Sequence, residues 1–144
     1  MLIGEYQHTI DPKKRLSLPV KFRKELGRTV IVTRGLDQCL FIFPLSAWKK
    51  LVGKFSELSF GSGEARSFNR FMLAGAVEVE VDAAGRILLP EFLKTFAGLA
   101  SSVVLTGIND RVEIWDQARW DSYKKKMESQ GEELAQRLGE IGVL

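Results

Sequence analysis

The sequence predicts a mainly β protein with short helices, an α+β chain in which two tandem repeats of βαβ type interlock into one barrel-like core. Three observations support this prediction. The chain repeats itself at an offset of about 71 residues. Short apolar runs are bounded by turn residues, and one repeat alone is too small to bury a sheet face. With 144 residues, 45% of them hydrophobic, the chain is long enough to form such a core.

A nine-residue box that occurs twice anchors the repeat. Asp11-Pro-Lys-Lys-Arg-Leu-Ser-Leu-Pro19 matches Asp82-Ala-Ala-Gly-Arg-Ile-Leu-Leu-Pro90 at an offset of 71. Residues 31–43 then match residues 103–115 at an offset of 72. This agreement indicates a duplication, and we divide the chain into repeat 1 (5–51), a helical connector (52–75), repeat 2 (76–123) and a helical C-terminal tail (124–144).

The first strand and turn of each repeat follow from residue alternation and from turn chemistry. Residues 6–10 and 77–81 are predicted strands, the second alternating Val and Glu so that one face is apolar and the other polar. The turns at 11–14 and 82–85 both begin with Asp, which favours the first position of a turn. Each repeat is therefore expected to begin with a β-hairpin.

The returning strands, helices and second hairpins complete each repeat. Residues 15–18 and 86–89 return as strands, and Pro19 and Pro90 end them at the first turn of a helix. The remaining elements are predicted at matching positions in the two repeats: helices 20–26 and 91–97, hairpin strands 30–33 with 40–43 and 103–105 with 111–115, and helices carrying Trp48 and Trp120.

Two further helices are predicted outside the duplicated units. Ser62–Leu73 has Phe68, Phe71 and Met72 at near-helical spacing, which predicts a helix packed on the core rather than a ligand site. Residues 120–138 carry Tyr, Met and Leu among charged residues. They predict an amphipathic helix that docks on the barrel or on a neighbouring subunit.

The net charge of +3 is unevenly distributed along the chain. Residues 1–60 hold eleven Lys or Arg and five Asp or Glu, a balance of +6, whereas residues 61–120 have a balance of −2 and residues 121–144 of −1. This asymmetry predicts either a surface that faces a polyanion or a solvated basic face.

Several classes of function are disfavoured by composition. Cys39 is the single cysteine and His8 the single histidine, which argues against a disulfide, a Cys-based zinc site and most His-dependent catalysis. No phosphate-cradling loop, secretory leader or membrane-spanning run is found. We therefore expect a reduced, cytosolic protein that is not an enzyme and has no metal, cofactor, membrane or small-molecule substrate, with Cys39 as a buried hydrophobic residue.

The paired boxes and the stretch Ala74-Gly-Ala-Val-Glu-Val-Glu-Val-Asp82 resemble the MraZ family, whose members are similar to two fused AbrB-type swapped-hairpin elements. The resemblance covers about residues 4–123. It implies a double-split, swapped-hairpin β-barrel that is cytoplasmic and nucleoid-associated. It also implies a sequence-specific transcriptional regulator of the cell-division and cell-wall gene cluster, which binds repeated elements in double-stranded promoter DNA as a ring-shaped homo-oligomer.

The resemblance places the functional loops in the two boxes. For Arg15 we favour DNA contact, because Lys13 and Lys14 lie beside it. For Arg86 we favour an ion pair with Asp82, with DNA contact as the alternative. The expected DNA-binding set is Lys13, Lys14, Arg15, Lys21, Arg23, Lys24 and Arg86, with Arg28 extending the basic density; Asp11, Asp82 and Gly85 are the expected structural turn residues.

The two loops are expected to differ. Lys14 stands where repeat 2 has Gly85, which leaves the turn type of the first loop open, because lysine tolerates positive φ poorly. Repeat 1 also carries more positive charge than repeat 2, and it is expected to contribute more to the affinity for DNA. For Lys21, Arg23, Lys24 and Arg28, phosphate contact and a solvated face remain equally open. The alternative function is an antitoxin-type protein-interaction module with an AbrB-like fold.

Overall fold

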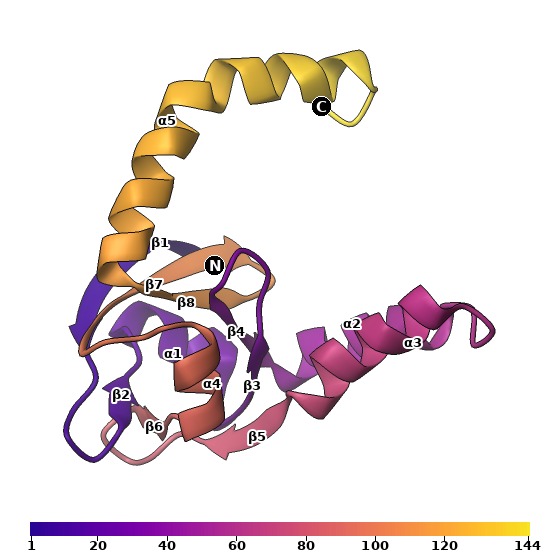
Figure 1. Cartoon of the computed structure of the whole chain (residues 1–144). Helices are drawn as coiled ribbons and strands as arrows, with labels where there is room; N and C mark the ends of the chain where they lie inside the picture. Colours follow the sequence, from indigo (N-terminus) through magenta and orange to yellow (C-terminus); the bar gives the residue numbers. More distant parts are fainter.

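The computed structural model describes residues 1–144. Its elements confirm the order predicted for both repeats (Figure 1). They are β1 (Leu2–Thr9), β2 (Arg15–Ser17), α1 (Val20–Leu26), β3 (Thr29–Arg34), β4 (Leu40–Pro44), α2 (Leu45–Ser56), α3 (Gly63–Asn69), the π-helical segment η1 (Arg70–Ala74), β5 (Val77–Glu80), β6 (Arg86–Leu88), α4 (Glu91–Phe96), β7 (Ser102–Asn109), β8 (Val112–Asp116) and α5 (Gln117–Glu140).

The strand order has an internal two-fold symmetry. Six strands form one antiparallel sheet in the order β1-β7-β8-β4-β3-β5, and β2 pairs with β6 in a second sheet. Exchanging each strand for its equivalent in the other repeat reverses the first order and leaves the second unchanged. The duplication seen in the sequence is therefore also a symmetry of the fold.

The repeats interlock by exchanging their first strand–turn–strand units, whose strands pair with the other repeat rather than with each other. β1 of repeat 1 pairs with β7 of repeat 2, and β5 of repeat 2 pairs with β3 of repeat 1. In the small sheet Leu16 lies opposite Ile87, its own equivalent at offset 71. Both side chains are fully buried in a cluster of 20 apolar residues drawn from the two repeats. Each repeat thus supplies part of the other's core, as the small size of one repeat required.

The two sheets are antiparallel and carry short helices, which confirms the α+β class. β1 and β5 are the two edges of the six-stranded sheet, and they do not pair with each other. Backbone hydrogen bonds therefore do not close this sheet into a barrel.

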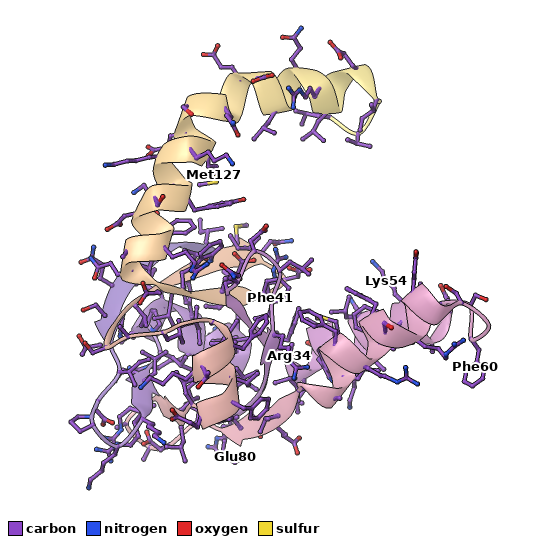
Figure 2. The ribbon with its side chains drawn as sticks, viewed as in Figure 1. Arg34, Phe41, Lys54, Phe60, Glu80 and Met127 are labelled. Carbon is purple, nitrogen blue, oxygen red and sulfur yellow. The ribbon has the colours of Figure 1, made fainter.

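The connector and α2 form a helical arm that projects from the body (Figure 1). The predicted helix is present as α3 followed by η1, but only its C-terminal part packs on the core. Met72 is buried, and its carbonyl accepts a hydrogen bond from Thr33 Oγ1 at 2.7 Å. Arg34 lies between body and arm (Figure 2) and donates from Nη1 to the Phe71 carbonyl at 3.0 Å.

The C-terminal tail is part of one continuous 24-residue helix, α5, which begins at Gln117. Trp120 is its one buried residue, and the helix extends away from the body as a second arm (Figure 1). The predicted amphipathic helix is therefore present, but most of it does not dock on its own barrel. Neither α5 nor any other helix is long and apolar enough to cross a membrane.

Candidate functional site

Asp11 organises the loop between β1 and β2. Its Oδ1 accepts hydrogen bonds from the backbone N–H groups of Lys13 at 2.9 Å and Arg15 at 2.8 Å, and its Oδ2 accepts from Arg15 Nε at 2.8 Å. The turn is closed by the Lys14 N–H, which donates to the Asp11 carbonyl at 2.9 Å. One carboxylate therefore fixes both the backbone and the arginine of this loop.

Asp82 repeats this geometry between β5 and β6. Its Oδ1 accepts from the N–H groups of Ala84 and Arg86, and its Oδ2 accepts from Arg86 Nε, all at 2.9 Å. In both loops the hydrogen bond from the arginine N–H, followed by the guanidinium itself, lowers the pKa of the aspartate below its usual range. The structural role predicted for the two aspartates agrees with these contacts.

The two loops have the same turn conformation, which settles the turn type that the sequence left open. Lys14 has φ of +64° and Gly85 has φ of +80°, so both loops use a left-handed residue at the same position. Lysine accepts this conformation because the Asp11 hydrogen bonds fix the residues on both sides of it. Its Nζ also lies 2.7 Å from Glu91 Oε2 at the start of α4, which belongs to the other repeat.

The two loop arginines have the same environment. Arg15 Nε lies 2.8 Å from Asp11 Oδ2, and Arg86 Nε lies 2.9 Å from Asp82 Oδ2. Both side chains are one-third exposed, and neither uses its Nη atoms in a hydrogen bond within the chain. The ion pair favoured for Arg86 is present, and Arg15 forms the same pair with Asp11.

The β1–β2 loop is here called loop 1 and the β5–β6 loop is called loop 2. A basic groove lies between loop 2 and α1. It is lined on one side by Asp82, Ala83 and Gly85, and on the other by Arg23, Lys24 and Arg28. The Arg23 side chain crosses Gly85 so closely that a Cβ there would lie 2.2 Å from its Cζ. Arg23 Nε donates to the Leu18 carbonyl at 2.9 Å, which holds the guanidinium over the loop.

The equivalent groove at loop 1 is less basic. It is lined by Asp11, Pro12 and Lys14 of the loop and by Lys94 of α4. Lys94 occupies the position of Arg23 at offset 71, and Ala100 stands where the other groove has Arg28, at offset 72. Because the hairpins are exchanged, the basic helix of repeat 1 serves the loop of repeat 2.

The structure thus separates residues that the sequence grouped together. Arg23 and Lys24 line the groove at loop 2, whereas Lys13, Lys14 and Arg15 belong to loop 1, and exposed Lys21 lines neither groove. Glu91 and Lys94 were missed as neighbours of loop 1. The offset of 71 could have found Lys94 as the partner of Arg23, but only with the hairpin exchange known.

Fold and site together define a duplicated swapped-hairpin protein, with two Asp–Arg loops at one edge of the molecule (Figure 1). The family model for "MraZ protein, putative antitoxin-like" matches residues 1–71 and again 72–140. The chain therefore belongs to the MraZ family of transcriptional regulators, which are not enzymes.

Curated relatives match along nearly the whole chain. "Transcriptional regulator MraZ" of Natranaerobius thermophilus is 43% identical over 143 residues, which cover 99% of this chain and 100% of the relative. The protein of the same name from Acetivibrio thermocellus is 44% identical with the same coverage. That of Heliobacterium modesticaldum is 47% identical over 138 residues, 96% of each chain.

Proposed function

We propose that this chain binds repeated elements in double-stranded promoter DNA through its two Asp–Arg loops. As a transcriptional regulator it would act on the cell-division and cell-wall gene cluster, in the cytoplasm at the nucleoid and as a ring-shaped homo-oligomer. The observation that carries the proposal is the basic groove, where Arg23, Lys24 and Arg28 surround loop 2. Three cations beside one rigid turn suit a phosphate backbone.

The loops would supply base contacts while the groove cations position the protein. Asp11 and Asp82 use both carboxylate oxygens to fix Arg15 and Arg86 through Nε. The free Nη atoms of each guanidinium remain available for phosphate or for guanine acceptors. A two-stranded ribbon fits the major groove of DNA, and the antiparallel β2–β6 pair is such a ribbon, with one of the two loops at each end.

We also infer that the two sheets are the parts of one double-split barrel. The small β2–β6 sheet contributes Leu16 and Ile87 to the same apolar cluster as strands of the large sheet. In that arrangement the barrel would fix the spacing of the two loops, which a pair of separate hairpins would not.

Oligomerisation would strengthen the binding of repeated DNA elements. One chain offers two loops, and the ion pairs in them leave few free charges. A ring that presents several chains would gain affinity through effective concentration, provided that the DNA elements have a matching spacing. A monomeric variant should therefore bind repeats much more weakly than the parent chain, and about as weakly as it binds a single element.

The test is a mobility-shift titration with DNA from upstream of the gene, at two salt concentrations. Replacing Lys13, Lys14 and Arg15 with Ala, together with Arg23, Lys24 and Arg28, should abolish specific binding and flatten its salt dependence. A control variant replaces Lys124, Lys125 and Lys126, which removes three positive charges from α5, away from the loops. If the six-residue variant bound this DNA as tightly as the parent chain does, the assignment of the loops and the groove as the DNA-binding site would be refuted. If the parent chain itself did not bind, the antitoxin-type module would be favoured.

A further inference from the structure

The β2–β6 ribbon has one face in the core and one face turned outward. Leu16 and Ile87 are buried in the large apolar cluster. Because side chains alternate across a strand, the residues that flank these two in sequence point to the opposite face. Figure 1 shows both strands at the lower edge of the body, away from the two helical arms. The outward face is therefore the part of the ribbon that a bound duplex would meet.

Four side chains make up this outward face, here called the ribbon face: Arg15, Ser17, Arg86 and Leu88. In the antiparallel register Arg15 lies opposite Leu88, and Ser17 lies opposite Arg86. Residues that lie directly opposite each other have Cβ atoms about 5 Å apart. Each arginine therefore has one cross-strand neighbour on the ribbon face, and the two neighbours differ in chemistry.

Leu88 is the apolar member of the ribbon face. Its side chain is 59% exposed, whereas the equivalent position at offset 71 holds the polar Ser17. A single exposed leucine is common on protein surfaces and carries no function by itself. Leu88, however, lies directly opposite a loop arginine, on the face that the proposed function turns towards DNA. Its apolar surface is stabilised only if a partner covers it.

The major groove of DNA offers an apolar partner at one kind of base pair. Thymine presents its C5-methyl group there, which apolar side chains contact, and guanine presents two acceptors that suit an arginine. Neighbouring base pairs are about 3.4 Å apart along the helix. A separation of about 5 Å between two side chains therefore suits contacts with adjacent base pairs. Arg15 has both Nη atoms free within the chain for the first contact, and Leu88 has an exposed side chain for the second.

We propose that Leu88 is a specificity-determining residue, which contacts the methyl group of a thymine beside the base pair that Arg15 contacts. This contact rests on the proposed function, because it requires the ribbon face to lie in the major groove. Ser17 supplies no such contact beside Arg86, since its hydroxyl forms hydrogen bonds with donors or acceptors of several bases. The two ends of the ribbon thus select different bases although their arginines match, and the chain binds an asymmetric element in one preferred orientation.

The test replaces each thymine of one labelled promoter element in turn with deoxyuridine, which lacks only the methyl group. Binding of the full chain is measured by fluorescence anisotropy. The parent chain should bind about fourfold more weakly when one particular thymine is replaced, because one methyl group then no longer leaves water. Leu88→Ser should bind the thymine and uracil forms at that position equally, since the two changes remove the same contact.

A matched control removes an exposed apolar side chain elsewhere. Ile3 on β1 is 58% exposed, and Ile3→Ser should keep the fourfold preference for thymine. Both substituted side chains are mostly exposed, so both variants should keep the parent circular-dichroism spectrum and melting curve.

The outcomes separate this contact from the proposed function. If the parent chain bound the element but no uracil substitution weakened it, the methyl contact would be overturned while DNA binding stood. A thymine preference that survived in Leu88→Ser would overturn the role of Leu88 in the same way. If the parent chain did not bind the element at all, the proposed function would fail, and the contact of Leu88 with it.

Discussion

The distribution of phosphate contacts between the two loops gives the sharpest prediction. One variant replaces Arg23, Lys24 and Arg28 with Ala and so empties the groove at loop 2 of its cations. The matched variant replaces Lys13, Lys14 and Arg15 and removes the same formal charge from loop 1. The sequence alone predicts that the second variant is the weaker DNA binder, whereas the geometry predicts the reverse.

The expected magnitude follows from counting cations that are not already neutralised. Each phosphate contact contributes about 0.9 to the slope of log affinity against log salt, so three groove cations amount to about 2.7. In loop 1, Lys14 lies 2.7 Å from Glu91 and Arg15 lies 2.8 Å from Asp11, which leaves Lys13 as the free charge. That variant should lower the slope by only about 0.9.

These slopes translate into affinities that can be measured. Between 50 and 200 mM salt the parent chain should lose about 40-fold more affinity than the groove variant, but only about 3.5-fold more than the loop 1 variant. The assay is fluorescence anisotropy with one labelled promoter element at four salt concentrations. Equal slopes for the two variants, or a larger loss for the loop 1 variant, would refute the assignment of the α1 cations to loop 2.

Three further predictions concern stability. Gly85→Ala should cost about 1–2 kcal/mol for its positive φ and more for displacing Arg23, because a Cβ there would lie 2.2 Å from Arg23 Cζ. Gly98→Ala, with a φ of +61° and only Arg119 Nη2 near its Cβ at 3.7 Å, should cost only the strain of the positive φ. Urea unfolding compares the two variants. Leu16→Ala and Ile87→Ala should each cost about 2–5 kcal/mol in the same assay, because the residues are equivalent and fully buried. Burial, and then the Arg23 charge, lower the pKa of His8 below 6.5. The folded state therefore resists protonation of His8, and the free energy of unfolding should fall as the pH drops below about 6.5. Thermal melts at pH 7 and 5 should show that His8→Gln removes this contribution to the pH dependence.

The order of elements could be predicted from the sequence because local signals repeat. The helix predicted at residues 20–26 has those bounds in α1, and the strands differ from their predicted bounds mainly at their ends. These signals occur twice, as the aspartates of the two boxes and as Pro19 and Pro90. An element predicted in one repeat is therefore supported by the element predicted at the equivalent position of the other. The lengths of α2 and α5 could not be predicted, since glycines stand inside both helices (Gly53, Gly131 and Gly139) as well as beyond their ends and so do not mark where a solvent-exposed helix stops.

The environment of the site residues could not be predicted, because it depends on which hairpin pairs with which. Asp11 and Arg15 are four residues apart, so the ion pair between them is a local contact. The proximity of Arg23 to Gly85 spans 62 positions and depends on β5 crossing to β3 of the other repeat. The positive φ of Lys14 was equally hidden, since the residue type argues against it and only the shared turn geometry requires it.

The hairpin exchange also changes the meaning of the charge asymmetry. If each loop packed against its own helix, the balance of +6 in residues 1–60 would make one basic loop and one neutral loop. Exchange instead places α1 of the first repeat beside the loop of the second, and α4 beside the loop of the first. Loop 1 therefore has basic residues in its own turn, whereas the basic residues beside loop 2 lie on and just after α1. Two loops that look unequal in sequence can thus both present positive charge, as binding to successive phosphates of one DNA duplex would require.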